Sequence, residues 1–305
     1  MPSKKSKANK EAAALVVIKS SLGKDKKRAD QWLVERGLVE TREKAKALIM
    51  AGQVLAGTKR IDKPGEALDI SQANTLSLKA VLPYVSRGGL KLERALEAFG
   101  VQPEGKLALD IGASTGGFTD CLLQRGARAV FAVDVGQSQL AWKLQTDPRV
   151  TVLDKTNIRY LESLPLSEAG ASPVLVELVV IDVSFISLKL VLPAARRLSL
   201  PGAPIVSLVK PQFEAGREQV GKGGIIREPA VHRKVLKDLV EWCSENQFLV
   251  KALTRSPILG TEGNAEFLAE LYAVDYKLDQ TQMLSLVGPL FEPVQPDTTH
   301  SREEI

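Results

Sequence analysis

The sequence predicts an α/β protein in two parts: a small α+β domain, then a doubly wound parallel sheet with helices on both faces. Three observations lead to this prediction. The 305 residues suffice for about two domains at ~150 residues each. Short helical segments with many basic residues come first. From residue 107 onward, apolar strands alternate with helical stretches, which is typical of a parallel sheet between two layers of helices.

Composition excludes several classes of protein. Hydrophobic residues make up 44% and charged residues 25%, as in ordinary globular domains. The two cysteines, Cys121 and Cys243, form no CxxC pair, and there are two histidines, so we expect neither a disulfide scaffold nor a metal site. The longest uncharged runs, such as 198–209, fall short of the ~20 apolar residues that a membrane span requires. We therefore expect a cytoplasmic protein.

The positive charge is concentrated near the N-terminus. Residues 1–60 hold 15 Lys and Arg against 6 Asp and Glu, a net charge of +9, so the remaining residues carry −4. A basic region of this kind attracts phosphate backbones through counterion release. We expect residues 1–24 to be a basic mobile tail, whose charges are most simply solvated.

Residues 25–85 predict two short helices followed by small strands. Apolar residues recur at helical spacing from Ala29, and Gly37 ends the first helix. Thr41 is the expected N-cap of the second helix, which Gly52 closes. Short strands are expected at 53–56 and 68–70, and from 61.

The basic side chains of this segment are expected to line one face and to hold RNA phosphates. The alternative is a small domain whose charges only solvate it. The candidate RNA-binding residues are Lys27, Arg28, Arg36, Arg42, Lys44 and Lys46. The stretch 28–49, with Gly-Gln-Val-Leu at 52–55, resembles the alpha-L RNA-binding module of a small-subunit ribosomal protein and many pseudouridine synthases. This resemblance implies an RNA partner.

The expected parallel sheet occupies the middle of the chain. Its strands are expected at 107–111, 130–134, 150–153, 178–182 and 205–209, with helices at 117–124, 188–198 and 230–245. Ligands of such sheets bind beyond the carboxyl ends of the strands. Acids end four successive strands, and the first opens a glycine-rich turn, Asp-Ile-Gly-Ala-Ser-Thr-Gly-Gly-Phe-Thr-Asp. We therefore expect a ligand pocket at this edge.

The turn and the strand-end acids predict a nucleotide-like ligand. The glycines allow close backbone approach, but their spacing is not GxGxxG, which counts against a dinucleotide. Asp110 suits a ligand with a cationic group, Asp134 ribose hydroxyls, and Asp154 an adenine amino group. The alternative for each is a helix N-cap. The candidate cofactor-binding residues are Asp110, Gly112, Ser114, Gly116, Gly117, Phe118, Asp134 and Asp154.

Two lysines and two acids form a second set of candidates, the catalytic one. Asp182 and Lys210 each end a predicted strand, and a lysine is unusual there because burial disfavours its charge. Lys91 lies on the helix expected to join the two domains, and Glu266 lies near the start of a late strand.

These four residues match, in order and context, the Lys-Asp-Lys-Glu tetrad of FtsJ-like ribose 2′-O-methyltransferases. Four motifs support the match: Ser-Arg-Gly-Gly-Leu-Lys-Leu, the glycine-rich turn, Asp-Val-Ser-Phe-Ile-Ser and Val-Lys-Pro-Gln-Phe-Glu. Together with the alpha-L module, residues 25–275 resemble the TlyA (haemolysin A) family. The resemblance implies a Rossmann-like class I methyltransferase sheet over residues 86–276, with 277–305 left as a C-terminal tail. It also implies S-adenosylmethionine as donor and ribosomal RNA or ribosomal subunits, at cytidine, as acceptor.

A ribose hydroxyl is a poor nucleophile at neutral pH, so the protein must orient it and help to deprotonate it. We hypothesise that Lys210 accepts the proton or stabilises the forming alkoxide and that Lys91 positions the hydroxyl. Asp182 and Glu266 would orient the lysines.

Three other functions are weighed against this one. A non-catalytic RNA-binding assembly factor would not need the complete tetrad. A haemolysin would need a signal or a spanning helix, and neither is seen. An NAD-dependent enzyme would be expected to carry GxGxxG.

Some residues allow more than one interpretation. The glycine-rich loop 220–228 is either a mobile phosphate contact or a plain surface loop, and Trp142 lies either near an adenine or in the core. His232 is expected on a helix surface.

Overall fold

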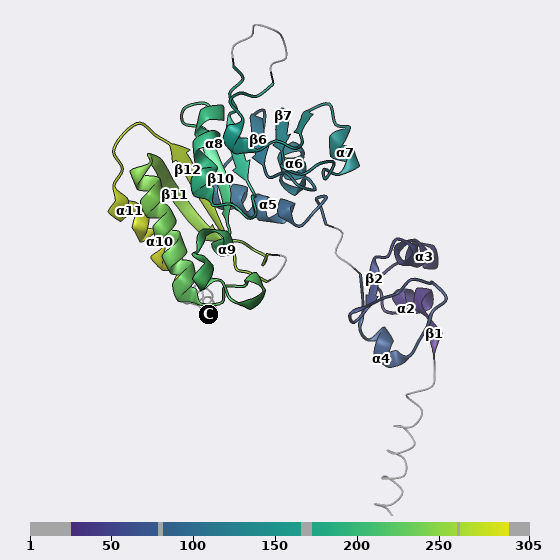
Figure 1. The fold of residues 1–305 in the computed structure, drawn as a ribbon. Helices are drawn as coiled ribbons and strands as arrows, with labels where there is room; N and C mark the ends of the chain where they lie inside the picture. The colour runs from purple at the N-terminus through teal and green to yellow at the C-terminus, as the bar shows by residue number, and fades with distance from the viewer. Residues whose placement is uncertain (1–25, 79–81, 166–172, 261–262, 293–305) are drawn as a thin grey trace, which may run out of the picture. The chain divides into compact units, whose positions relative to one another are not determined.

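The computed structural model describes residues 26–78, 82–165, 173–260 and 263–292 (Figure 1). The predicted tail 1–24 and the last part of the predicted C-terminal tail, 293–305, lie outside the described residues. The chain divides into two compact units between Val81 and Leu82, and each is described by itself.

The first unit is a pair of helices with small antiparallel strands. Its elements are β1 (Lys27–Arg28), α2 (Ala29–Glu35), α3 (Arg42–Met50), β2 (Val54–Ala56), β3 (Lys59–Arg60), β4 (Ala67–Leu68), α4 (Ile70–Ala73) and β5 (Leu76–Leu78). β2 pairs with both β3 and β5, and β1 pairs with β4. The predicted cap is present, because the Thr41 side chain accepts a hydrogen bond from Lys44 N at 3.2 Å. The predicted strand 68–70 stops at Leu68, because the Asp69 side chain caps α4.

The core of this unit forms between the two main helices and the strands. Leu33 of α2 and Ile49 of α3 are buried together with Ile61. The indole N–H of Trp32 donates to Leu68 O at 2.9 Å. This bond ties α2 to β4. The basic side chains of α3 and those at the two ends of α2 lie at the surface.

The second unit contains a seven-stranded sheet with the order β11-β12-β10-β9-β6-β7-β8. The strands are β6 (Leu107–Ile111), β7 (Ala129–Val133), β8 (Val150–Leu153), β9 (Leu178–Ile181), β10 (Pro204–Val209), β11 (Phe248–Arg255) and β12 (Phe267–Ala273). All five predicted strands are present and parallel, which confirms the α/β class. The sheet is not parallel throughout, however. β12 runs antiparallel between β10 and β11, and the sequence did not reveal β11.

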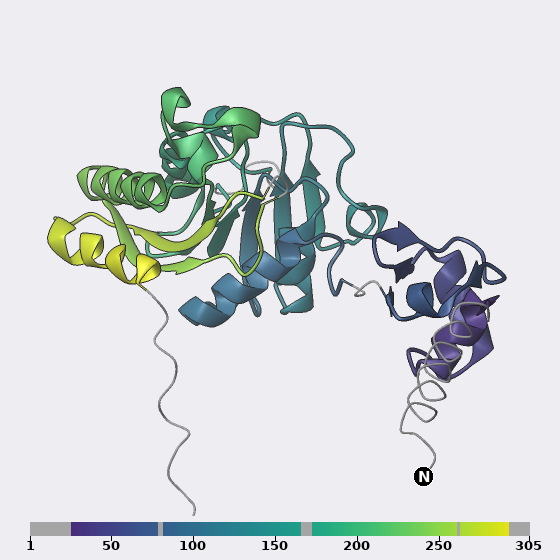
Figure 2. The same cartoon turned by 90° about the horizontal axis from the view of Figure 1, so that it is seen from below.

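Helices cover both faces of this sheet (Figures 1 and 2). They are α5 (Gly88–Phe99), α6 (Gly117–Gln124), α7 (Trp142–Gln145), η1 (Ile158–Tyr160), η2 (Leu188–Leu190), α8 (Leu192–Leu198), α9 (Pro211–Glu214), η3 (Arg217–Gln219), η4 (Lys222–Gly224), α10 (Pro229–Glu245), α11 (Gln280–Ser285) and η5 (Gly288–Phe291). α5, on which Lys91 lies, falls within the second unit.

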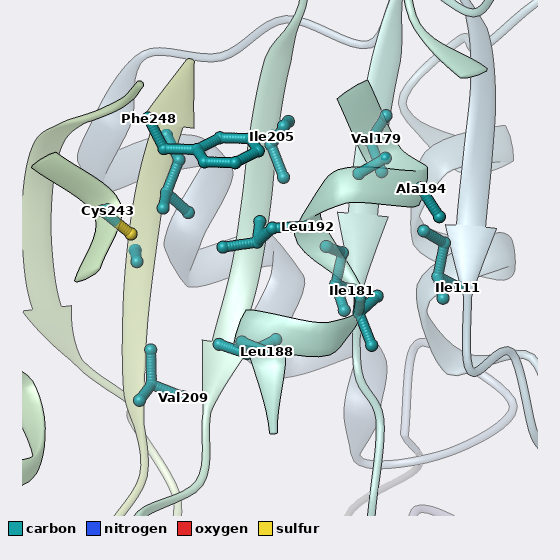
Figure 3. Close-up of a cluster of buried hydrophobic side chains, with 14 of the residues drawn as sticks. Ile111, Val179, Ile181, Leu188, Leu192, Ala194, Ile205, Val209, Cys243 and Phe248 are labelled. Atoms are coloured by element: carbon teal, nitrogen blue, oxygen red, sulfur yellow. The ribbon is translucent and has the colours of Figure 1, made fainter. Parts of the chain in front are cut away.

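The alternation of side chains along each strand separates the core into two layers. Ile111, Val179 and Ile181 face α8 and α10 and pack with Leu192 in the layer that Figure 3 shows. The intervening residues, such as Val180, face α5 and α6 in the other layer. A residue's position in its strand therefore decides which helices cover it.

The segment predicted as a C-terminal tail from residue 277 is folded in its first half. α11 packs against α10, and Met283 and Val287 are buried in the core layer of Figure 3. Other apolar residues of the segment, among them Leu278, Leu284 and Leu290, pack against the same core and hold the segment in place. A helix of six residues is too short for its periodicity to have predicted it.

Candidate active site

The four predicted catalytic residues line one cavity of about 270 Å³ at the carboxyl edge of the parallel strands. Lys91 lies near the start of α5, Asp182 directly follows β9, and Lys210 directly follows β10. Glu266 reaches the same edge by a different route. It precedes β12, whose first residue, Phe267, pairs with the last residue of β10 because the two strands are antiparallel.

Each lysine of this cavity has its own carboxylate. Lys91 Nζ lies 2.5 Å from Glu266 Oε2, and Lys210 Nζ lies 2.7 Å from Asp182 Oδ1. The side chains of Lys91 and Lys210 are only 11% and 12% exposed. Lys210 also donates an aligned hydrogen bond to Ser184 Oγ at 2.9 Å. The structure thus holds two buried ammonium groups in fixed directions. The one of Lys210 meets two oxygens of the same loop, Asp182 Oδ1 and Ser184 Oγ.

The glycine-rich turn forms the wall beside the tetrad. Gly112, Ser114, Gly117 and Phe118 all line the cavity. Gly112 has φ +85°, and a Cβ at this position would lie 2.5 Å from Asp182 O. A side chain there would therefore displace the residue that carries a catalytic carboxylate. Gly116 does not line the cavity. A glycine is required there for structural reasons, because φ is +93° and a Cβ would lie too close to Leu140.

A larger cavity of about 430 Å³ adjoins the first and shares Gly112, Ser114, Asp182 and Ser184 with it. Its other walls are mainly apolar and include Val133, Val135, Ile158, Val183 and Val191. This volume lies within the range of ligand pockets in proteins.

Asp134 is the strand-end acid on the wall of this larger cavity. Its carboxylate accepts hydrogen bonds from Ser114 N at 2.8 Å and from Gly136 N at 2.7 Å. These bonds fix the orientation of the carboxylate and leave further lone pairs for a ligand.

The other two predicted cofactor acids do not line either cavity. Asp110 lies inside β6, and its side chain points to the α6 face of the sheet, where it accepts a 2.6 Å hydrogen bond from Thr119 Oγ1. It is fully buried, and burial raises its pKa to about 7. Asp154 accepts a hydrogen bond from Ser138 N at 2.7 Å. Asp110 therefore ties β6 to α6, and Asp154 holds the loop at Ser138.

A third cavity of about 290 Å³ shares Ser184, Lys210 and Glu266 with the first. Phe185, Gln212 and Phe213 line it together with Val220 and Gly224 of the glycine-rich loop. Residues of the tetrad therefore line all three cavities, Asp182 the larger one and Lys210 and Glu266 the third.

The second half of the glycine-rich loop is fixed and not mobile. Asn264 donates to Gly224 O and accepts from Ile226 N, both at 2.9 Å. His232 Nε2 lies 3.1 Å from Ile226 O, and this residue is buried, so the prediction of a helix-surface histidine was wrong. Burial lowers the pKa of His232. Trp142 is exposed and lies in neither core nor cavity.

The candidate RNA-binding residues of the first unit are held by acids of the same unit. The carboxylate of Asp30 is fully buried, and it contacts Arg28 at 3.0 Å and Arg42 at 3.2 Å. The hydrogen bond from Arg28 is the main reason that the pKa of Asp30 is lowered. Both arginine side chains remain 47% exposed, so one buried acid presents two guanidinium groups to solvent.

The remaining basic candidates have weaker partners or share a groove. Lys27 pairs with Glu35 at 2.8 Å, Lys44 approaches Glu40 at 3.7 Å, and Arg36 lies over the Trp32 ring. Lys46 lines an open groove of about 850 Å³ whose other basic residues are Arg28, Lys59, Arg60 and Lys63. Lys59, Arg60 and Lys63 were missing from the prediction because they lie on the short strand β3 and in the loop after it, and not on a helix.

Several residues of the site went unnoticed in the sequence. Arg87, Thr115, Ser184, Asn157 and Gln212 line the three cavities. Four of them stand inside motifs that were already recognised, so membership of those motifs was the available signal. Asn157, by contrast, follows the third strand without a motif of its own.

Comparisons with known proteins agree with this geometry. The family model described as FtsJ-like methyltransferase matches residues 84–272, and the S4 domain model matches residues 27–72. YqxC of Bacillus subtilis, provisionally named an rRNA methyltransferase, is 53% identical over 247 residues, which cover 81% of this chain and 86% of YqxC. The 16S/23S rRNA (cytidine-2′-O)-methyltransferase TlyA of Mycobacterium tuberculosis is 44% identical over 79% of this chain and 87% of its own.

Solved structures show the same likeness. A protein from Streptococcus thermophilus, provisionally named a hemolysin, is 48% identical with a TM-score of 0.65. The match covers 87% of this chain and 95% of that one. Across the described residues, the structure has no helix that combines the length and apolar character needed to cross a membrane.

Proposed function

Because the chain belongs to the FtsJ-like methyltransferase family, we propose that it transfers a methyl group from S-adenosylmethionine to the ribose 2′-hydroxyl of a cytidine in ribosomal RNA. The observation that carries the proposal is that the whole tetrad lines one cavity, which shares Asp182 with a larger, mainly apolar cavity and Lys210 and Glu266 with a third. The relatives named rRNA (cytidine-2′-O)-methyltransferases support the acceptor class, at 44% and 37% identity. This acceptor makes the reaction a cytoplasmic one.

The larger cavity fits S-adenosylmethionine in the chemistry of its walls. The oriented carboxylate of Asp134 suits the two ribose hydroxyls, and Val135 and Ile158 suit a flat base. The left-handed Gly112 lets the backbone come close to the ligand. When bound, this cofactor supplies a methyl group that its sulfonium already activates.

The residues of the tetrad divide the remaining work. As a neutral amine, Lys210 accepts the proton of the 2′-hydroxyl, or, as an ammonium group, it stabilises the charge forming on that oxygen, while the oxygen–carbon bond forms and the carbon–sulfur bond breaks. Ser184 and Asp182 aim its Nζ atom. Lys91, held by Glu266, positions the hydroxyl. Holding oxygen and methyl group in line can supply ~7–11 kcal/mol of the barrier.

We assign RNA capture to residues 25–85 and methyl transfer to residues 86–276. In the first unit, Asp30 holds the guanidinium groups of Arg28 and Arg42 toward solvent, where they can meet phosphates. Contacts of this kind position the RNA without reading its sequence.

The decisive experiment combines purified protein, methyl-labelled S-adenosylmethionine and unmodified ribosomal subunits, followed by nucleoside mass spectrometry. We expect 2′-O-methylcytidine, and we expect it to disappear in Lys210→Ala. Absence of methyl transfer to either subunit, with S-adenosylmethionine still bound, would refute the proposal and favour an RNA-binding assembly factor.

A further inference from the structure

Glu214 ends the short helix α9, which begins directly after Lys210. It lies outside the lining of the three cavities, yet both of its carboxylate oxygens are used. Oε2 accepts a hydrogen bond from Ser187 Oγ at 2.6 Å, and Oε1 accepts one from Leu188 N at 2.8 Å. The side chain of Glu214 thus joins α9, the helix that follows Lys210, to the end of the segment from Asp182 to Leu188.

The segment from Asp182 to Leu188 has little structure of its own. In the part of the chain that the structure describes, residues 183–187 donate no backbone hydrogen bond. Phe185 has φ +63°, a left-handed conformation that is costly for a residue with a side chain. A segment of this kind keeps its shape only where its surroundings hold it.

Three contacts attach this segment to α9 and to Lys210. At its start, Lys210 meets Asp182 at 2.7 Å and Ser184 at 2.9 Å. In its middle, the rings of Phe185 and Phe213 lie 5.0 Å apart. At its end stands Glu214. The contact that joins catalytic lysine to catalytic aspartate is therefore one end of a clamp whose other end is Glu214.

We propose that Glu214 is a positioning residue for methyl transfer, which holds Ser187 and Leu188 so that Lys210 keeps its contact with Asp182 and Ser184. The proposal rests on the proposed function. Glu214 acts through the reach of its side chain and not through its charge, because its two oxygens meet a hydroxyl and a peptide N–H.

The test compares Glu214→Ala, Glu214→Gln and Glu214→Asp with a control, Glu228→Ala. Glu228 is exposed, and its side chain does not cap α10. We expect Glu214→Ala to lower kcat by about 100-fold, the effect of a small misplacement at a catalytic group. Gln keeps the length and can still meet both partners, so it should restore most of the turnover. Asp keeps the charge but is one carbon too short, so it should not.

Amide hydrogen exchange is the readout that does not depend on activity. In Glu214→Ala and Glu214→Asp, we expect faster exchange confined to the hydrogen-bonded amides at the two ends of the segment, Asp182 and residues 188–190. Rescue of kcat by Asp and not by Gln would overturn the proposal, as would wild-type kcat in Glu214→Ala. Faster exchange throughout the unit would also overturn it, since the role would then be general stability. If the wild-type protein transfers no methyl group, the proposed function fails, and the exchange comparison still decides whether Glu214 holds the segment.

Discussion

Both units of the molecule pair basic side chains with acids, but they differ in whether the basic partner is buried as well as the acid. In the tetrad cavity, Lys91 and Lys210 are nearly enclosed, with exposures of 11% and 12%. In the first unit the acid is enclosed, because Asp30 is fully buried while Arg28 and Arg42 are 47% exposed.

Under the proposed function, this contrast separates chemistry from capture. A buried lysine acts on one atom in a fixed direction, and the loss of its partner leaves an uncompensated charge. An exposed arginine held by a buried acid keeps its charge available to a large anionic partner, and salt screens that interaction. Substitutions in the two regions should therefore fail in different ways.

The largest effect is expected at Lys210. In Lys210→Arg the charge is kept, but a guanidinium cannot accept a proton at neutral pH. If Lys210 is the base, this variant should lose about 10²–10⁴-fold in kcat, as general-base variants do. Cofactor binding measured by titration calorimetry should persist, because Lys210 does not line the larger cavity. A Lys210→Arg enzyme with near wild-type turnover would show that only the positive charge matters. Lys234→Ala, a surface lysine paired with Asp238, is the control.

The next effect concerns the other buried pair. Glu266→Ala leaves the ammonium group of Lys91 buried without its partner, so we expect about 3–5 kcal/mol loss of unfolding free energy. Replacing both partners, in Lys91→Met with Glu266→Leu, should restore much of the stability but not the methyl transfer. Urea unfolding of the three proteins measures this difference. Equal stability of Glu266→Ala and the wild type would mean that the pair is solvated.

A third effect depends on pH. The folded-state pKa of Asp110, about 7, lies above its unfolded value of ~3.9. Its contribution to stability is therefore complete below about pH 4 and is lost as the pH rises to 7. Asp110→Asn can still accept from Thr119 and does not ionise, so its stability relative to the wild type should increase from pH 5 to pH 8.

Asp147→Asn provides the opposite sign when the pH series is extended below ~4. The hydrogen bond from Arg149 lowers the pKa of Asp147, so the contribution of that acid to stability is complete above its unfolded pKa and is lost as the pH falls through its folded pKa. Unfolding curves at several pH values measure both variants. If the unfolding free energies of Asp110→Asn and the wild type change with pH in the same way, the pKa of Asp110 is the same in the folded and the unfolded protein, and the prediction is wrong.

The smallest effect is expected in the first unit. Arg28→Ala and Arg42→Ala should each weaken RNA binding and lower the salt dependence of the binding constant by about one unit of slope. At saturating RNA, kcat should stay unchanged, because capture and chemistry are separate. Filter binding at several salt concentrations measures the slope. A fall in kcat without a change in slope would assign these arginines to the reaction.

Much of the fold was legible in the sequence because its signals are local. The five parallel strands are mostly apolar runs, and the longer helices between them carry an apolar face at helical spacing. The short or irregular elements, α11 and β11 among them, were missed, since six residues or a strand broken by a bulge provide too few repeats. The prediction for His232 was wrong for a related reason. Ile226 and Phe267, which contact its side chain, lie outside α10, so the helical spacing of the sequence does not reveal them.

The sequence by itself determined which residues stand at strand ends, because a strand end is a local event. Asp182 and Lys210 could therefore be placed at the carboxyl edge, and the motifs around them indicated the class of reaction. Only the tertiary structure decided which acid meets which lysine. The antiparallel direction of β12 brings Glu266 to Lys91, and the alternation of side chains along β6 turns Asp110 away from the cavity. Strand direction and side-chain facing depend on the neighbours that a strand finds, and no stretch of sequence carries that information alone.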